Sequence, residues 1–267
     1  MEPGNQSRRR RVVVTGLGAV SPVGNTVEEM WAALLAGKSG VDRISSYDTA
    51  DFDVKIAAEV KKFDATQYAT RKQVQRMDRF TQFAVAASLQ AIQSAGLTIN
   101  DSNALDTGVI IGNCVAGLVS ICEELKVMDK YGPSRVSPIV GPTMIPDAAG
   151  VQVSLITGTK GLNYATSSAC SSSADAIGLG YEAILRGDAR IVIAGGTEAP
   201  IIPFVMASFT NIRALSTRND DPAGACRPFD GERDGFVIGE GSGLLVLEEA
   251  SYAEERGAPI LAELVGY

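Results

Sequence analysis

The sequence predicts an α/β protein whose sheet is rich in parallel strands and is covered by helices on both faces. Segments with helical periodicity alternate with short, uninterrupted apolar runs, and such runs are typical of strands buried on both faces. The chain has 267 residues, of which 45% are hydrophobic and 21% are charged. This length and composition are those of a globular protein with a full hydrophobic core.

The expected strands are apolar segments bounded by turn-forming residues. They cover residues 12–15, 107–112, 162–165, 190–195, 236–238, 244–247 and 260–265. We interpret Gly16 and Gly18, which follow the first strand, as a tight turn. The dinucleotide-binding fingerprint would need a third glycine at the position of Ser21, and this disfavours a nucleotide-dependent oxidoreductase. The glycine-rich residues 239–243 are expected to form a turn between two strands.

The expected helices are marked by capping residues. They cover residues 27–36, 71–95, 147–157, 171–186 and 201–209, and a last helix begins at residues 251–254. Thr26 and Glu29 match a capping box at the start of the first helix, and Gly37 provides a left-handed stop after it. The only tryptophan, Trp31, lies in this helix and is expected to belong to the core.

The stretch around Cys170 is the strongest candidate for chemistry. A short apolar run precedes it, a helical pattern follows it, and small residues fill the corner between them, in the order Thr-Ser-Ser-Ala-Cys-Ser-Ser-Ser. Small side chains allow a strand to turn sharply into a helix. The helix N-terminus would favour an anion, and the thiolate is the reactive form of cysteine. From spacing alone, a buried and inert thiol is an equally good interpretation.

Composition excludes several classes of function. The chain has no histidine, which excludes Ser-His-Asp and Cys-His catalysis within these residues. The formal net charge of −7 argues against a general nucleic-acid-binding protein. No apolar run approaches the roughly 18 residues that a membrane-spanning helix needs, so no membrane span is predicted.

The remaining cysteines are not expected to carry chemistry. The four cysteines are widely spaced and include no Cys-x-x-Cys pair, so neither a disulfide framework nor a zinc site is expected. Reduced thiols are typical of a cytoplasmic protein. Cys114 and Cys122 are expected to be inert core thiols, and Cys226 is expected to lie in a loop without a catalytic role. We predict no metal and no cofactor.

The segment YATSSACSSSADAIG, which contains Cys170, resembles the nucleophile segment of the β-ketoacyl-acyl carrier protein synthases. These are the condensing enzymes of fatty acid and polyketide synthesis. Long strings elsewhere share the likeness, at residues 10–40, 71–87, 194–200, 213–250 and 260–267. The resemblance is strongest to the elongating type II synthases of bacterial fatty acid synthesis. One departure is Ser-Ser-Ala-Cys-Ser-Ser-Ser, where the family usually has threonine before Ala-Cys and glycine soon after it.

The resemblance implies a thiolase-like fold, of which this chain would be the N-terminal half. The full fold stacks two similar halves in five layers, αβαβα. We therefore expect a disordered basic tail at residues 1–10, an N-terminal synthase domain at 11–258, and the start of the C-terminal synthase domain at 259–267. The family uses two histidines with its cysteine, and both belong to the second half, so the chain is expected to be incomplete as a condensing enzyme.

The resemblance also implies a reaction and partners. Cys170 would accept an acyl chain, and Claisen condensation with malonyl-carrier protein would extend it by two carbons. The N–H of Cys170 is a candidate oxyanion donor, and Val115 and Phe209 are candidate acyl-pocket residues. The acidic acyl carrier protein would dock on exposed basic residues. These are Arg71, Lys72, Arg135, Arg213 and Arg218.

The resemblance further implies a homodimer for the full-length enzyme. One alternative is a polyketide-type ketosynthase subunit. A second alternative is a non-catalytic paralogue or partner subunit, like the chain-length factors of polyketide systems. Those proteins lack the nucleophilic cysteine, so Cys170 argues against a non-catalytic role.

Overall fold

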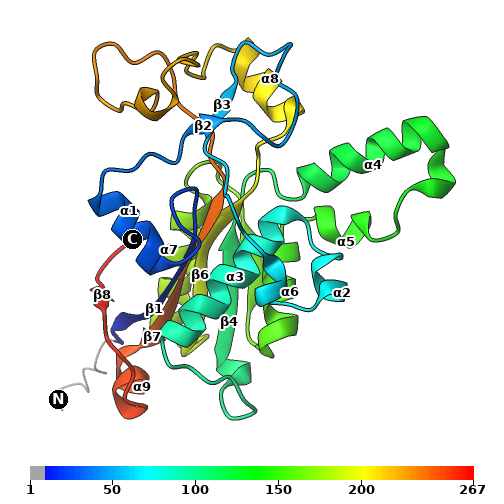
Figure 1. Cartoon of the computed structure of the whole chain (residues 1–267). Helices are drawn as coiled ribbons and strands as arrows, with labels where there is room; N and C mark the ends of the chain where they lie inside the picture. Colours follow the sequence, from blue (N-terminus) through cyan, green and yellow to red (C-terminus); the bar gives the residue numbers. More distant parts are fainter. Residues whose placement is uncertain (1–9) are drawn as a thin grey trace, which may run out of the picture.

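One mixed six-stranded sheet forms the centre of the computed structural model, which describes residues 10–267 (Figure 1). Its strand order is β5-β4-β6-β7-β1-β8. The strands are β1 (Val12–Val20), β4 (Thr107–Gly112), β5 (Asn163–Thr166), β6 (Ile191–Glu198), β7 (Gly241–Glu249) and β8 (Ala262–Leu264). Except for Arg10, the predicted basic tail at residues 1–10 lies outside the described residues.

Nine α-helices lie within the described part of the chain. They are α1 (Val27–Leu35), α2 (Arg71–Val74), α3 (Arg79–Ser94), α4 (Leu118–Tyr131), α5 (Val140–Met144), α6 (Ala148–Thr157), α7 (Ser172–Arg186), α8 (Pro203–Asn211) and α9 (Ala250–Glu255). A small two-stranded sheet is made by β2 (Asp42–Arg43) and β3 (Ile56–Ala57). No helix among residues 10–267 combines the length and apolar character needed to cross a membrane.

The sheet is less parallel than predicted. Strands β5, β4 and β6 run parallel to one another, but β7 is antiparallel to both β6 and β1, and β8 is antiparallel to β1. The prediction of a parallel-rich sheet therefore holds for only one half of it. An apolar run reports that a strand is buried on both faces, but it carries no information about the direction of the neighbouring strand.

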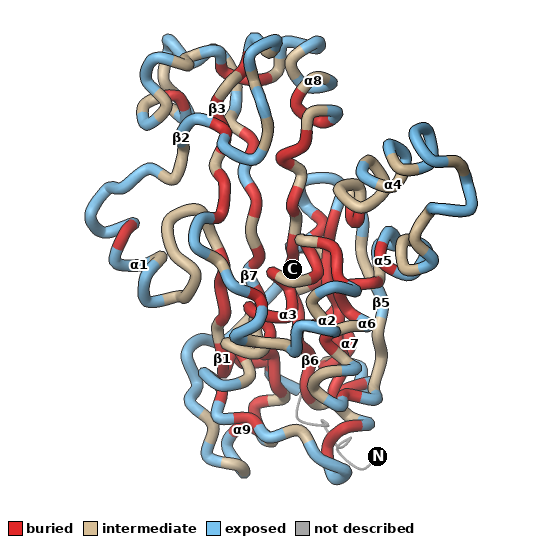
Figure 2. The backbone as a smooth tube through the Cα atoms, turned by 45° about the vertical axis from the view of Figure 1, so that its right-hand side comes forward, coloured by how far each residue is buried: buried red, intermediate tan, exposed pale blue. Residues whose placement is uncertain are grey.

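Helices cover both faces of the sheet, as predicted. Helix α3 packs over β1, β7 and β6 and also contacts α6, whereas α7 packs over β6 and β4 on the opposite face (Figure 1). Within β4 the side chains alternate between these two layers. Val109 and Ile111 belong to the hydrophobic cluster that includes residues of α3, whereas Ile110 belongs to the cluster that includes residues of α7. In Figure 2 the buried residues accordingly concentrate along the strands, whereas most of α1 lies exposed and α4 has no buried residue.

The predicted turn at Gly16 and Gly18 is wrong. Strand β1 continues through both residues to Val20, with a register irregularity between Val14 and Gly16. The two glycines are needed because α3 crosses the strand closely. A Cβ atom on Gly16 would lie 2.1 Å from the carbonyl oxygen of Ala91, and one on Gly18 would lie 1.8 Å from that of Ala87.

The predicted long helix at residues 71–95 is interrupted. It forms as α2 and α3, separated by residues 75–78. The buried Asp78 caps α3, and its carboxylate also accepts hydrogen bonds from the backbone N–H and the hydroxyl of Ser120, at 2.9 and 2.6 Å. The apolar period continues across the break, so periodicity alone could not locate it.

Three further expectations fail in local detail. Residues 236–238 form no strand, since only Phe236 makes an isolated bridge, to Leu215, and the glycines Gly241 and Gly243 lie inside β7. Trp31 is 59% exposed and does not belong to the core. Strand β5 was expected to be buried, but it is the edge of the sheet and Tyr164 is 37% exposed.

Candidate active site at Cys170

Cys170 lies at the corner between β5 and α7, as the sequence predicted. The parallel strands β4, β5 and β6 have their carboxyl ends at the same level of the sheet, where Gly112 is paired with both Thr166 and Gly196. Helix α7 begins at Ser172, immediately above this edge. The thiol is therefore placed beside the N-terminus of a helix, where backbone N–H groups favour an anion.

Serine hydroxyls hold the shape of this corner. The Ser172 hydroxyl donates to the carbonyl of Ala169 at 2.7 Å and accepts from the N–H of Ser168 at 2.9 Å. The Ser171 hydroxyl donates to the carbonyl of Ser168 at 2.8 Å. Ala169, the residue before the nucleophile, adopts a left-handed conformation with φ of 54°. This conformation is uncommon outside glycine, and the hydroxyl bonds on both sides stabilise it.

Two strand-end glycines allow α7 to approach the sheet. A Cβ atom on Gly112 would lie 2.2 Å from the carbonyl oxygen of Ser172, and one on Gly196 would lie 2.4 Å from the Cβ of Ser173. Both distances are far below van der Waals contact, so only glycine fits at either position. The start of α7, and with it Cys170, therefore rests directly on the ends of β4 and β6.

Cys170 is exposed in a cavity of about 530 Å³. The cavity is lined by the ends of β1, β4 and β6 and by the starts of β7 and α7, and the side chains of Cys114, Glu198 and Glu240 also line it. An exposed thiol in an open cavity is accessible to a reagent or substrate. This excludes the interpretation of Cys170 as a buried, inert thiol.

Glu198 is a member of the site that sequence reasoning missed. It ends β6, and one carboxylate oxygen accepts hydrogen bonds from the backbone N–H groups of Cys114 at 2.6 Å and Val115 at 2.9 Å. The pKa of Glu198 is raised above its ordinary value, chiefly by burial and also by the charge of Asp78. The hydrogen bonds from backbone N–H groups lower this pKa and offset part of the effect. An acidic residue at the end of a buried apolar strand was the signal that could have identified it.

Cys114 also lies in the site, and the prediction of an inert core thiol is wrong for it. It is exposed and lines the same cavity as Cys170, because β4 ends at Gly112 and the chain after it runs along the cavity. The sequence showed an apolar run but not where that run ends relative to the sheet edge. Cys122 is half-buried in α4 and packs against a hydrophobic cluster without belonging to its buried residues, and its inertness stays a prediction. Cys226 is exposed in a loop, as predicted.

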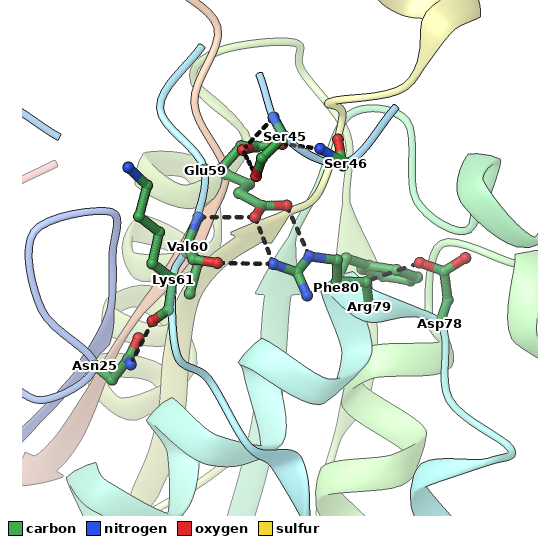
Figure 3. Close-up of polar contacts among 10 residues, drawn as sticks. Asn25, Ser45, Ser46, Glu59, Val60, Lys61, Asp78, Arg79 and Phe80 are labelled. Atoms are coloured by element: carbon green, nitrogen blue, oxygen red, sulfur yellow. Dashed lines mark hydrogen bonds and ion pairs between the residues drawn. The ribbon is translucent and has the colours of Figure 1, made fainter. Parts of the chain in front are cut away.

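A half-buried ion pair holds Glu240, which lines another wall of the cavity. The Arg79 guanidinium makes two hydrogen bonds to the Glu240 carboxylate, at 2.6 and 2.9 Å, and donates a third to the carbonyl of Val60 at 3.0 Å. Figure 3 shows Arg79 beside the Val60 backbone, with Glu59 accepting from Ser45 and Ser46 above them. This network ties the start of β7 to α3 and to the segment after β3.

The two candidate acyl-pocket residues do not line this cavity. Val115 is half-buried next to Cys114, and Phe209 lies in α8 with its ring edge-on to Phe236 at a centroid distance of 5.7 Å. Their assignment stays a prediction. Within residues 10–267 no cluster of three or more histidine, cysteine or acidic side chains could hold a metal ion.

The five candidate docking residues are not equivalent. Arg71 and Lys72 are exposed on α2, Arg135 follows α4 in a short 3-10 helix, and Arg213 is exposed after α8. Arg218 differs from these four residues. Its guanidinium lies 3.5 Å from the Asp234 carboxylate and donates to the carbonyl of Glu232 at 2.7 Å, so it is engaged in holding its own loop.

Comparison with known proteins agrees with this geometry. Residues 9–253 match the family model described as "Beta-ketoacyl synthase, N-terminal domain". The chain is 48% identical over 259 residues to 3-oxoacyl-[acyl-carrier-protein] synthase 2 of Synechocystis sp., an alignment that covers 97% of this chain and 62% of that protein. The chain thus spans less than two thirds of the length of this curated relative.

Solved structures share the fold. A β-ketoacyl synthase from Burkholderia phymatum STM815 aligns with a TM-score of 0.87 and 38% identity, over 96% of this chain and 63% of that one. A type II PKS acyl-carrier protein in complex with its ketosynthase aligns with a TM-score of 0.84 and 33% identity, over 96% and 62%. The fold is that of the ketosynthases, which are thiolase-like. The chain belongs to the β-ketoacyl synthase family and contains its N-terminal domain.

Proposed function

We propose that this chain is the nucleophile-bearing part of a 3-oxoacyl-acyl carrier protein synthase of fatty acid synthesis. In this proposal Cys170 attacks the thioester of an acyl carrier protein, keeps the acyl chain and releases the carrier thiol. The observation that carries the proposal is the exposed Cys170 thiol beside the start of α7, in a chain that is 48% identical to a curated synthase of this kind. A helix N-terminus favours the thiolate that such an attack requires.

The site supplies some of the groups that acyl transfer needs. Attack on the thioester creates negative charge on the carbonyl oxygen, and the backbone N–H of Cys170 at the corner is a candidate donor for it. Glu198 acts as a positioning residue, because it fixes the backbone of Cys114 and Val115 opposite Cys170. Val115 and Phe209 are the proposed contacts of the acyl chain.

The second half of the reaction needs groups that these residues do not contain. Condensation requires decarboxylation of malonyl-carrier protein, and the chain has no histidine to assist it. The curated relative is longer than the part that this chain covers. We therefore assign only acyl transfer to Cys170, and propose the domain division at residues 11–258 and 259–267 together with it.

The proposed partner is an acyl carrier protein. The related ketosynthase solved in complex with its carrier protein supports this choice, and exposed Arg71, Lys72, Arg135 and Arg213 provide positive charge for an acidic partner. The full-length enzyme is proposed to be a cytoplasmic homodimer. Strand β5 lies at the edge of the sheet, with Tyr164 exposed, and is available for a contact between two copies.

A polyketide ketosynthase subunit is the second candidate. The type II PKS ketosynthase with a TM-score of 0.84 favours it, but the identity of 33% is lower than the 48% to the fatty acid enzyme. Matched acyl substrates distinguish the two. If the first candidate is correct, an acyl carrier protein that bears a saturated acyl chain should acylate Cys170 faster than one that bears a polyketide-type chain.

The proposal is tested by acylation of the chain itself. Incubation with saturated acyl-carrier protein, followed by digestion and mass spectrometry, should place the acyl group on the Cys170 peptide. The Cys170→Ser variant should lose the acyl group, and Cys226→Ser, which removes an exposed cysteine outside the cavity, should keep it. Equal acylation of Cys226 and Cys170 in the folded chain would contradict the proposal.

A further inference from the structure

Cys170 shares its cavity with a second cysteine, Cys114. Both are free and exposed, and both line the same cavity. Cys226 lines a separate cavity with Arg213 and Phe236, and Cys122 lies on α4, facing a third one. Cys114 and Cys170 are therefore the two described cysteines that line one cavity together.

The chain path brings these two cysteines out of neighbouring strands. Cys114 follows the end of β4 and Cys170 follows the end of β5, and the two strands are adjacent and parallel. The pairing continues beyond the strands, since the N–H of Asn113 donates to the carbonyl of Thr166 at 3.1 Å. Beyond the strands, the chain turns at Ser168 and forms an isolated bridge between Ser168 and Cys170, so that Cys170 lines the same cavity as Cys114. A disulfide between them needs a Cα separation of roughly 4.4–6.8 Å.

The surroundings of Cys114 differ from those of Cys170. Burial raises the pKa of the Cys114 thiol, and the charges of Glu198 and Cys170 raise it further. Glu240 is the other carboxylate in the cavity, and Arg79 neutralises it. Cys114 therefore remains protonated at neutral pH and is a poor first nucleophile. Cys170, at the helix N-terminus, is the cysteine that reacts first.

We propose that Cys114 and Cys170 form a redox-modification site in which Cys114 converts oxidised Cys170 into an intramolecular disulfide. The oxidant is a peroxide that enters the cavity. The Cys170 thiolate attacks one peroxide oxygen and the O–O bond breaks, which gives a sulfenic acid and hydroxide. The Cys114 sulfur then attacks the Cys170 sulfur, the S–O bond breaks, and the oxygen leaves as water with the Cys114 proton.

The electrons balance over the two steps. The two thiols together lose two electrons and two protons, and one hydrogen peroxide molecule is reduced to two water molecules. A small dithiol reverses the modification by thiol–disulfide exchange. The disulfide would keep Cys170 from further oxidation to sulfinic acid, which ordinary thiols do not reverse. This inference goes beyond acyl transfer, since it requires only that peroxide reaches a reactive Cys170.

The experiment exposes the 267-residue chain to three equivalents of hydrogen peroxide, because sulfinic acid on one thiol consumes two equivalents. Free thiols are then blocked with N-ethylmaleimide, and the unreduced protein is digested and analysed by mass spectrometry. We expect a linked pair of peptides that contain Cys114 and Cys170, which dithiothreitol separates. In Cys114→Ser and Cys114→Ala the link should be lost and Cys170 should carry sulfinic acid. The matched control Cys226→Ser should keep the link.

Two results would overturn the proposal. One is sulfinic acid on Cys170 of the unsubstituted chain, formed as fast as in Cys114→Ser and without any linked peptide. The other is a link that joins Cys226 of two chains while Cys114 stays free. Acylation of Cys170 is measured separately on the reduced chain. A chain that forms the link but is not acylated would refute the proposed function and leave the redox site intact.

Discussion

The carboxylate of Glu198, at the end of β6, accepts a hydrogen bond of 2.6 Å from the backbone N–H of Cys114. The same oxygen accepts a second bond, of 2.9 Å, from the N–H of Val115. Because both donors belong to the backbone, they fix the path of the chain after β4 whatever side chains it carries. Glu198 therefore determines where the wall opposite Cys170 lies.

Replacement of Glu198 by glutamine should change how folding stability depends on pH. The pKa of Glu198 is raised above its ordinary value of 4.5, chiefly by burial. A raised carboxyl pKa in the folded state gives stability that is present below the ordinary value and lost as the pH rises through the folded value. Glu198→Gln removes this loss. Its stability relative to the unsubstituted protein should therefore increase with pH, by at most about 1.4 kcal/mol per pH unit.

Glu59→Gln provides a control with the opposite sign. Burial acts to raise the pKa of Glu59, but hydrogen bonds from Ser45 and Ser46 outweigh it, and the net pKa is lowered. Its contribution to stability is present above the ordinary pKa and lost as the pH falls through the folded value. Urea unfolding between about pH 3 and pH 7 measures both variants, because Glu59 titrates below its ordinary pKa and Glu198 above it. Identical pH trends for the two variants would contradict the opposite directions of the two pKa shifts.

Gly112→Ala should displace the start of α7. The new Cβ would lie 2.2 Å from the carbonyl oxygen of Ser172, and overpacking of this kind typically costs about 1–3 kcal/mol. The alkylation rate of Cys170 by iodoacetamide should change as well, since the corner must move. Gly243→Ala is the matched control, because Gly243 lines the same cavity but a Cβ there meets no atom within 4 Å. Equal unfolding midpoints for the two variants would refute the close packing of α7 against the strand ends.

Local residue chemistry explains which parts of the fold could be predicted from the sequence. Strand β4, the cap at Thr26, the left-handed stop at Gly37 and the corner at Cys170 follow from short-range patterns and form as predicted. The glycines Gly16 and Gly18 could not be interpreted locally, because their role depends on α3, which lies far along the chain. Strand direction and the exposure of Trp31 likewise depend on tertiary neighbours.

The candidate site divides in the same way. The corner at Cys170 could be predicted because its small residues are adjacent in the sequence, but the choice of a reactive over a buried thiol rested on the family resemblance. Glu198 and Cys114 reach the cavity only through the pairing of β4 with β6, which no local pattern reports. Their proximity to Cys170 is a consequence of the sheet order.

Charge reversal should separate the proposed docking residues from Arg218, which holds its own loop. Lys72→Glu and Arg213→Glu should weaken binding of acyl carrier protein, with a larger effect at low salt, because exposed charges chiefly steer association. Arg218→Glu should instead lower the unfolding temperature, since Arg218 holds its loop through Asp234 and Glu232. Lys38→Glu, an exposed lysine after α1, controls for net charge. Affinities that do not depend on salt in any of these proteins would exclude this surface.

Self-association of the chain is expected through α1. Trp31, Leu34 and Leu35 are 59%, 51% and 72% exposed, and their spacing places them on one side of the helix. Contiguous exposed apolar side chains promote association. Light scattering should therefore give a mass above that of a monomer, and the double substitution of Trp31→Gln with Leu35→Lys should lower it. Leu261→Lys, at an exposed apolar residue elsewhere, is the control, and a monodisperse monomer of the unsubstituted chain would contradict the prediction.

Carbon dioxide release from malonyl-carrier protein should fail in this chain even where acyl transfer to Cys170 succeeds. Decarboxylation leaves a carbanion that must be stabilised as it forms, and histidine is the side chain whose pKa suits that role at neutral pH. None of the 267 residues is histidine. The Glu198 carboxylate, which lines the cavity and has no basic partner there, would repel a developing negative charge. Release is measured with acyl-loaded chain, and Cys170→Ser sets the background. Release above that background would show that another group in this domain stabilises the carbanion.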